Sequence, residues 1–476
     1  MTKPDSDKNE YLGIDMGSSS VKIIRISNDR VLQQEREKYK EISPVGWWNA
    51  LLIALRKMGS LENIEAIALS SQVGTYIIDT ADGRQEVLLW SDVAGTEELE
   101  TVRRKYSKEQ FIDNIRMDHP DLVSYPIPRL LYIRKKYPKA VAVCQLKDYI
   151  CEKLTGERVT DEWSWRGLSD TETDSYNDFF VKEINPPLLP PMRPIQDKNG
   201  VPAICGIIKP EVALETGLPI GTKVFCGMND FFCGLLGMGI FHGGDCFDIT
   251  GTSEHFGCIS DTPVSDSKLI AGPYLNGYVH YGVTASSGTS IDFGRRVFEQ
   301  TEFDDCCQLS DSTPIFLPYI GGERAPIYDP DSMGVFFGIK PGTTKADMSR
   351  SVYEGVAFSI YHIFKTMEMT SEPKYIVTGG GASVNRGLNQ LKADLFGCKL
   401  RSLKDKETSA LGAAMIAWCG CNGSKVDGAI ERFCITEDEY IPTMDKNYRS
   451  KLLYRFSIYK ELYPVLRPVF HEKENI

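Results

Sequence analysis

The sequence predicts an α/β protein built from two similar domains, because one strand–turn–strand pattern occurs twice, half a chain apart. The first copy covers residues 11–27 and the second covers residues 246–260. In each copy, short apolar runs typical of strands flank a turn rich in glycine, serine and threonine. A third stretch, residues 376–397, has the pattern of a strand, a triple glycine and a helix. Three such turns favour a nucleotide held between two similar domains, whereas one alone would be weak evidence.

The first hairpin has the composition of a phosphate-binding turn. Asp15 ends its first strand and is followed by Gly17, Ser18 and Ser19. Glycine allows a tight turn and close approach of a ligand, and the backbone N–H groups suit a phosphate. A carboxylate would repel a bare phosphate, so Asp15 indicates a cation between them, and Mg²⁺ fits that role. The alternative is a plain hairpin with polar turn residues, and this stretch alone does not decide between the two.

Further strands and helices follow in order along the chain. Residues 64–70 form an apolar run that fits a buried strand, and residues 224–229 form another that ends at Asp230. Because α/β folds bind ligands beyond the carboxyl ends of central strands, Asp230 and the polar residues 70–75 are candidates for a site. Helices are expected over residues 47–58, 147–154, 347–369, 388–396 and 408–418.

Composition restricts the compartment and the partners. The 476 residues are 42% apolar, enough for two substantial cores, and the net charge of −11 argues against a nucleic-acid partner. The thirteen cysteines are scattered with no CxxC pair, which indicates reduced thiols in a cytoplasm. The charged start lacks the apolar core of a signal peptide, and no run of about 18 apolar residues exists, so we expect no membrane partner. A homodimer is left open.

A series of motifs between residues 11 and 418 resembles the FGGY family of carbohydrate kinases, within the actin, hexokinase and Hsp70 superfamily. The motifs are GIDMGSSSVK, LLWSD, KDYICEKLTGERVTD, GMNDFFCGLLGMG, DITGTSEHF, LPYIGGERAPIYDPDSMGVFFGI, SVYEGVAFSIYHIF, GGGASVNRGLNQLKADLFG and ETSALGAAMIAW. The resemblance implies two ribonuclease H-like domains with a cleft between them. It places a sugar-binding domain over residues 1–241 and a nucleotide-binding domain over residues 242–476, with a tail of open role from residue 423.

The resemblance also implies transfer of the γ-phosphate of ATP, with Mg²⁺, to a hydroxyl group of a small sugar. Such a reaction needs the nucleotide held, its charge neutralised and the proton of the attacking alcohol accepted. Asp230 stands where the family has its catalytic aspartate, which implies a general base. From the residues alone, a helix N-cap is an equal alternative for Asp230. Asp15 and Asp230 are the implied magnesium ligands.

The nucleotide contacts implied by the family come from all three glycine-rich turns. The implied phosphate contacts are Ser18, Ser19, Gly251, Thr252 and Ser253. The implied adenosine contacts are Gly380, Gly381, Ala382 and Asn385. ATP and Mg²⁺ are therefore the expected cofactors.

The implied acceptor site departs from the family's pattern at the residue after the catalytic aspartate. Its residues are Gln72, Trp90, Asp92 and Phe231. Relatives have Asn or Gln at the position of Phe231, and a phenyl ring cannot make the hydrogen bond that such an amide gives to a sugar. The acceptor is therefore held differently, or it differs from the common ones.

Two other segments also differ from relatives. Val73, Gly74 and Ala94 stand where larger or charged side chains are usual, and residues 162–166 (EWSWR) replace small ones. These bulky groups either reshape the mouth of the cleft or only pack a loop. The GERAPIYDP and ASSGTSIDFG stretches look closest to xylulose and gluconate kinases. A ketopentose such as xylulose is thus the expected acceptor, with gluconate or another polyol or ketose as the alternative.

A function of another class stays open, since the same fold serves in nucleotide-dependent clamps and some kinase-like chains are non-catalytic sugar sensors. The presence of both Asp15 and Asp230 argues against a non-catalytic chain. The GERAP segment argues against an actin or a chaperone. Within that segment we expect the charged residues to pair with one another rather than to catalyse; they are Glu323, Arg324, Asp329 and Asp331.

Overall fold

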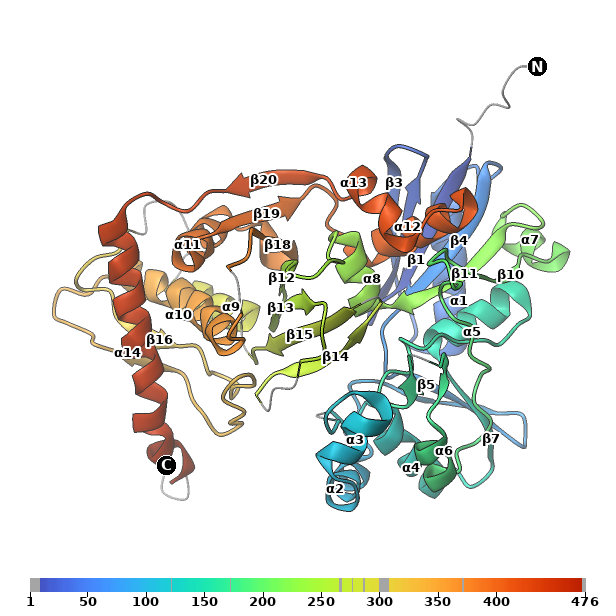
Figure 1. The fold of residues 1–476 in the computed structure, drawn as a ribbon, viewed down its shortest axis with the longest axis horizontal. Coiled ribbons are helices and arrows are strands. Elements are labelled where there is room, and N and C mark those ends of the chain that lie inside the picture. Colours follow the sequence, from blue (N-terminus) through green and yellow to red (C-terminus); the bar gives the residue numbers. More distant parts are fainter. Residues whose placement is uncertain are drawn as a thin grey trace. The chain divides into compact units, whose positions relative to one another are not determined.

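The computed structural model describes residues 9–120, 122–171, 173–264, 268–275, 277–285, 287–298, 308–369 and 372–472. The chain divides into two compact units, each with its own sheet (Figure 1). Unit 1 comprises Met1–Gly239 and Glu407–Ile435, and unit 2 comprises Ile240–Lys406 and Thr436–Ile476. This division differs from the sequence-based boundary at residues 241 and 242 in one long segment, because Glu407–Ile435 packs within unit 1.

Unit 1 is organised around a mixed six-stranded sheet with the order β10-β11-β4-β1-β2-β3. Its strands are β1 (Glu10–Met16), β2 (Ser20–Ile26), β3 (Val31–Lys38), β4 (Ile64–Ser71), β10 (Ile204–Ile207) and β11 (Lys223–Asn229). β1 and β2 form the expected hairpin, and Asp15 lies opposite Lys22 in its register. Because β4 runs parallel to both β1 and β11, the carboxyl ends of β1, β4 and β11 lie at one edge of the sheet.

Helices cover both faces of this sheet. The helices of unit 1 are α1 (Pro44–Lys57), α2 (Thr96–Lys105), α3 (Lys108–Ile115), α4 (Pro126–Lys136), α5 (Leu146–Thr155), α6 (Asp178–Ile184), α7 (Pro210–Thr216), α8 (Asp230–Gly237), α12 (Thr408–Asn422), η2 (Val426–Ala429) and α13 (Ile430–Phe433). Side chains alternate along β1, so Leu12 and Ile14 face the core formed with α1 and α5, while Gly13 faces α12. A Cβ atom on Gly13 would lie 1.9 Å from the carbonyl oxygen of Ala410, so β1 and α12 approach this closely only with glycine there.

A smaller three-stranded sheet in unit 1 carries several loops that bear on function. Its order is β6-β5-β7, and its strands are β5 (Tyr76–Thr80), β6 (Gln85–Leu88) and β7 (Ala140–Gln145). Tyr76 and Ile78 pack in a separate core with residues of α3, α4 and α6, and Trp165 lies in the same core. A two-residue ladder of β8 (Ser169–Asp170) and β9 (Ser175–Tyr176) follows that tryptophan.

Unit 2 contains a seven-stranded sheet with the order β14-β15-β13-β12-β18-β19-β20. Its strands are β12 (Cys246–Thr250), β13 (Glu254–Ser260), β14 (Ile270–Tyr274), β15 (Gly277–Val283), β18 (Tyr375–Gly380), β19 (Lys399–Leu403) and β20 (Thr436–Tyr440). A separate two-stranded sheet pairs β16 (Ile315–Leu317) with β17 (Val335–Phe337). β12 and β13 form the second expected hairpin, and β18 runs parallel to β12.

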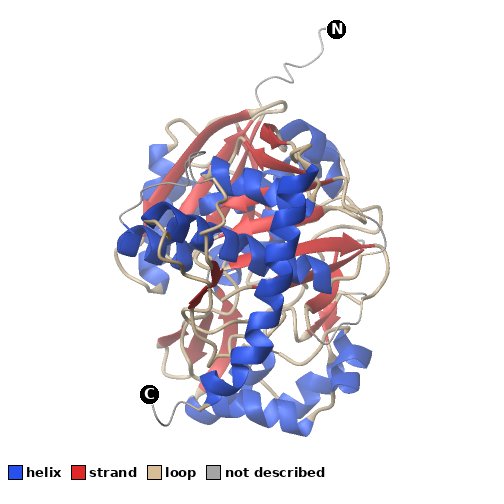
Figure 2. Ribbon diagram, turned by 90° about the vertical axis from the view of Figure 1, so that its left-hand side faces the viewer, coloured by secondary structure: helices blue, strands red, loops and turns tan. Residues whose placement is uncertain are grey.

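The helices of unit 2 pack around one apolar core. They are α9 (Gly288–Phe298), α10 (Lys345–Thr366), η1 (Gly381–Val384), α11 (Arg386–Phe396) and α14 (Lys446–His471). α14 comes from the tail of open role and is the long helix that ends near the C mark in Figure 2. Its residues Leu452, Phe456 and Tyr459 belong to the core, so the tail is part of unit 2 rather than an appendage.

Two features bear on the environment of the chain: the state of its cysteines and the apolar character of its helices. None of the described cysteines forms a disulfide, and Cys306 and Cys307 lie outside the described residues. In the part of the chain that the structure describes, no helix is both long and apolar enough to cross a membrane.

Candidate active site

Three expected site residues lie at one edge of the sheet of unit 1. Asp15 is near the end of β1, Gln72 follows β4, and Asp230 follows β11 directly. In the parallel register, Asp15 is beside Ser70, and Asn229 is beside Ser71. This edge is the position at which α/β sheets place ligands, as the sequence analysis expects.

Asp15 is buried and has a cationic neighbour. Its Oδ1 accepts a hydrogen bond of 3.0 Å from the Ser70 hydroxyl, and the Lys22 ammonium lies 3.8 Å from its Oδ2. Burial raises the pKa of Asp15, while the charge of Lys22 lowers it. Lys22 also lies 2.7 Å from Glu407, so one lysine links Asp15 on β1 to the residue before α12. No role for Lys22 or Glu407 was predicted from the sequence, although hairpin register alone places a lysine opposite Asp15.

Asp230 is the first residue of α8, but it does not cap that helix. The N-cap is Asn229, whose side chain accepts a hydrogen bond of 2.9 Å from the backbone N–H of Phe232. Asp230 Oδ1 accepts one of 2.8 Å from the N–H of Phe231. Removal from water, together with the negative charge of Asp15, raises the pKa of Asp230 to about 7. The helix therefore has its cap without Asp230, which leaves that carboxyl group available for chemistry.

The two carboxyl groups form a donor set that suits a divalent cation. Asp15 and Asp230 lie at the carboxyl ends of β1 and β11 on one edge of the sheet, and the charge of Asp15 contributes to the raised pKa of Asp230. Mg²⁺ binds through one or two carboxylates, water and phosphate oxygens. The residues present at this edge therefore fit the expected magnesium site.

The turn after β1 contacts Trp90, a residue expected to bind the acceptor. Ser18 and Ser19 are exposed, and the indole N–H of Trp90 donates a hydrogen bond of 3.1 Å to the Ser18 hydroxyl. Asp92 stabilises its own turn, because its Oδ2 accepts a hydrogen bond of 2.7 Å from the N–H of Leu89. The structure thus brings Trp90 to the phosphate-type turn.

The segment of residues 162–166 packs inward. Trp165 is fully buried, and its indole N–H donates to Asp148 at 3.2 Å. Trp163 is buried as well, with its ring edge-on to Phe232 at a centroid distance of 5.4 Å. Trp165 is therefore core packing, as one of the two expected alternatives has it, whereas Trp163 contacts the first turn of α8. No local sequence signal could have predicted that contact, because 69 positions separate the two residues.

In unit 2, the second hairpin turn holds Gly251, Thr252 and Ser253. The start of α9 lies against this turn, since the N–H of Gly288 donates to the Gly251 carbonyl at 2.9 Å and the N–H of Ser287 donates to the Thr252 carbonyl at 3.0 Å. Backbone hydrogen bonds therefore join the hairpin turn to the start of α9.

In the third glycine-rich stretch, two of the residues expected to contact the nucleotide also have a structural role. Gly380 has a φ of +83°, and a Cβ atom there would lie 2.1 Å from the Thr250 carbonyl oxygen. Asn385 caps α11, because its side chain accepts a hydrogen bond of 3.0 Å from the N–H of Leu388. Gly381 has open space around it. Ala382 lies in η1.

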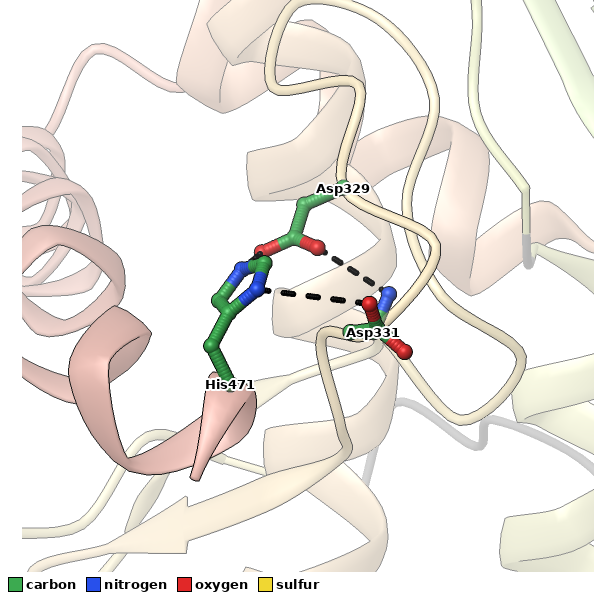
Figure 3. A group of neighbouring side chains, drawn as sticks. All are labelled: Asp329, Asp331 and His471. Carbon is green, nitrogen blue, oxygen red and sulfur yellow. Dashed lines mark hydrogen bonds and ion pairs between the residues drawn. The ribbon is translucent and has the colours of Figure 1, made fainter. Parts of the chain in front are cut away.

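Two acidic residues of the GERAP segment, Glu323 and Asp329, bond to groups other than the charged side chains of that segment. Glu323 accepts hydrogen bonds from the backbone N–H groups of Ala285 at 2.7 Å and Arg324 at 2.8 Å. Asp329 accepts one of 2.9 Å from the Tyr463 hydroxyl and lies 3.0 Å from His471 Nε2 (Figure 3). Burial opposes ionisation of Asp329, but the hydrogen bonds from Tyr463 and His471 outweigh it and lower its pKa.

Asp329, Asp331 and His471 offer ligand atoms within 4.8 Å of one another, close enough for a cation (Figure 3). However, Asp329 already accepts hydrogen bonds from Tyr463 and from the N–H of Asp331, and His471 is its neighbour. A cavity of about 550 Å³ beside the group is also lined by the cationic side chains of Lys268 and Arg467. We therefore assign the group to docking of α14 on the GERAP segment.

Comparison with known proteins matches both halves of the chain to one family. The model of the FGGY family of carbohydrate kinases, N-terminal domain, matches residues 10–237, and that of its C-terminal domain matches residues 248–421. A xylulose kinase of Staphylococcus epidermidis is 27% identical, covering 96% of this chain and 97% of its own. A xylulose kinase of Bacillus subtilis is also 27% identical, covering 95% of this chain and 96% of its own.

Solved structures confirm the predicted fold class. A ligand-bound xylulose kinase from Lactobacillus acidophilus has a TM-score of 0.86 at 22% identity, covering 98% of this chain and 99% of its own. A gluconate kinase from the same organism has a TM-score of 0.85 at 22% identity, with the same coverage. Since both domain models match in order over nearly the whole length, the chain belongs to the FGGY family of carbohydrate kinases, phosphotransferases that act on an alcohol group of a sugar.

Proposed function

We propose that Asp230 is the general base of this kinase and that xylulose, a ketopentose, is its acceptor. The observation that carries the first part is the position of Asp230 at the same strand edge as Asp15, with its pKa raised to about 7 and the helix cap supplied by Asn229. A base with a pKa near the working pH is well matched to accept the proton of an attacking hydroxyl. The acceptor rests on the relatives, which are named xylulose kinases.

The other expected residues take the roles that their positions support. Ser18 and Ser19 in unit 1, and Gly251, Thr252 and Ser253 in unit 2, would contact phosphate oxygens of ATP. Gly380, Gly381, Ala382 and Asn385 would contact adenosine, and Gln72, Trp90, Asp92 and Phe231 would face the acceptor. Asp15 and Asp230 would hold Mg²⁺, which supplies neutralisation of phosphate charge when bound. A cytoplasmic location and a homodimer remain expectations.

The test of the base is Asp230→Asn, which keeps the size of the side chain and removes its ability to accept a proton. Turnover with ATP and xylulose should fall by roughly 10²–10⁴-fold, while ATP binding stays nearly intact. Asp197→Asn is the matched control, because Asp197 is fully exposed and bonded only within its own loop. Near-normal turnover of Asp230→Asn would exclude Asp230 as the base. ATP hydrolysis that is slow and indifferent to sugars would instead favour a nucleotide-dependent clamp.

A further inference from the structure

Four polar groups near the strand edge of unit 1 are buried without a hydrogen-bond partner among the described residues. They are Gln72 Oε1, Trp163 Nε1, Ser164 Oγ and Arg166 Nη2. Gln72 is only 5% exposed, Trp163 is 4% exposed and Ser164 is 3% exposed. A buried polar group that is left unpaired loses its hydration without compensation, so native proteins retain few, and each one needs an explanation.

Contacts place the loop of residues 163–166 against the first turn of α8. The side-chain amide of Asn229 donates a hydrogen bond of 2.9 Å to the Trp163 carbonyl. The Trp163 ring lies edge-on to Phe232 at 5.4 Å, and the Arg166 guanidinium lies 5.3 Å from the same ring. Since Asp230 stands between Asn229 and Phe232 in sequence, the loop lies beside the proposed base.

A second link ties this loop to the segment that carries Gln72. One amide, that of Gln145, makes both contacts: its Nε2 donates to the Ser164 carbonyl at 2.6 Å, and its Oε1 accepts from the N–H of Gly74 at 2.9 Å. Gln72 itself is fixed at the strand edge, because its N–H donates to the Met16 carbonyl at 3.0 Å. The four unpaired groups therefore belong to segments that converge on the carboxyl ends of β4 and β11.

We propose that Trp163, Ser164 and Arg166 recognise the hydroxyl groups of the acceptor and supply the hydrogen bonds that Phe231 cannot. This inference rests on the proposed function. The indole and guanidinium groups donate, the Gln72 carbonyl accepts, and the serine hydroxyl does both. Hydroxyl groups of a polyhydroxylated chain match this mixed set, because each hydroxyl can donate and accept. Specificity thus lies in the loop after Asp161 as well as in the residue after the base.

The two tryptophans of this loop provide a matched test. Trp163→Phe removes the unpaired N–H and keeps a ring against Phe232, while Trp165→Phe removes an N–H that already donates to Asp148. Trp163→Phe should lower kcat/KM for xylulose about tenfold, mainly through KM, and leave KM for ATP unchanged. Trp165→Phe should lower Tm and leave kcat/KM within about twofold. If Trp163→Phe lowers Tm as Trp165→Phe does and leaves KM for xylulose unchanged, the proposal is wrong.

Ser164→Ala adds a readout that does not depend on turnover. Because the hydroxyl has no partner among the described residues, its removal should leave Tm of the free protein unchanged or higher, while stabilisation by added xylulose should decrease. A large loss of Tm in the free protein, or undiminished stabilisation by xylulose, would overturn the inference. If xylulose and gluconate stabilise the natural protein but the protein phosphorylates neither sugar, that result contradicts only the proposed function. If neither sugar stabilises the natural protein, the recognition proposal fails as well.

Discussion

At the scale of single residues, Glu162 is a carboxyl group with an unusual pH dependence. It is 3% exposed, and burial together with the charge of Asp161 raises its pKa to about 8 from an ordinary value of 4.5. Between these two values the unfolded chain has lost the proton that the folded chain still holds. The free energy of unfolding therefore falls as pH rises, by at most about 1.4 kcal/mol per pH unit from this group.

Glu162→Gln should remove that dependence. We expect the Tm of the variant relative to the natural protein to rise between pH 5 and pH 8, because only the natural protein has a carboxyl group at residue 162 whose ionisation is opposed by folding. Thermal unfolding of both proteins across this range measures the difference. Glu97→Gln is the control for the exchange itself, since its side chain is 83% exposed. A difference for Glu162→Gln that stays constant across this pH range would contradict the raised pKa of Glu162.

Phe231 is the residue at which acceptor preference can be moved. It is partly exposed and packs on Phe232 at 5.4 Å, so the ring presents an apolar surface directly after Asp230. Phe231→Asn adds a hydrogen bond worth about 0.5–1.5 kcal/mol and should raise kcat/KM for xylulose or gluconate by severalfold. Kinetics of both forms with both sugars measure this. Phe231 is only a packing substitution if the natural enzyme already reaches about 10⁴ M⁻¹s⁻¹ and the variant gains nothing.

Residues with a local signature could be predicted from the sequence, and residues defined by a distant partner could not. Asp15 lies one residue before the end of β1, and Asp230 directly follows β11; apolar runs in the sequence reveal both strand ends. Asn229 and Asp230 are both able to cap a helix, and only the backbone decides that Asn229 does so. The contact of Trp163 with α8 joins two segments far apart in sequence, so no periodic pattern reports it.

At the scale of elements, α14 depends on one buried acceptor for its attachment to the GERAP segment. Tyr463→Phe deletes the hydroxyl that donates to Asp329 at 2.9 Å and should lower the free energy of unfolding by about 1 kcal/mol. Urea denaturation measures the change. Tyr454→Phe on the same helix is the control, because Tyr454 is 69% exposed. Equal stability of the two variants would argue against docking through Asp329.

Helices begin at local capping motifs where the sequence has such motifs. α10 begins two residues before its expected start, at Lys345, because Thr344 and Asp347 form a capping box. α14 was not predicted, since its charged and aromatic composition gives no clean apolar stripe, and two prolines lie within it. Its burial against the core of unit 2 supplies the stability that the local pattern does not announce.

At the scale of the whole molecule, the chain leaves unit 1 at Gly239 and returns to it at Glu407. The return depends on small residues, since a Cβ atom on Gly412 of α12 would lie 1.9 Å from the Cys233 carbonyl oxygen of α8. Gly412→Ala should therefore destabilise the protein by about 1–3 kcal/mol, although alanine favours helix. Chemical denaturation measures this.

Gly234→Ala in α8 is the comparison, because its Cβ would meet no atom nearer than the Ser409 hydroxyl at 3.3 Å. That variant should be nearly neutral or slightly stabilising, given the better helix propensity of alanine. Similar destabilisation by both variants would mean that close packing of α8 and α12 is not what the glycines provide.

The path of the chain also sets an order during synthesis on the ribosome. The strands β1, β4 and β11 emerge early, but the helix that packs on Gly13 begins only at Thr408, after most of unit 2 has been made. Until then, a nascent chain carries a sheet in which the face around Gly13 lacks α12. Unit 1, whose translation begins first, is thus completed only after residue 406 has been made, and a pause before residue 408 exposes that face to chaperones or to other nascent chains.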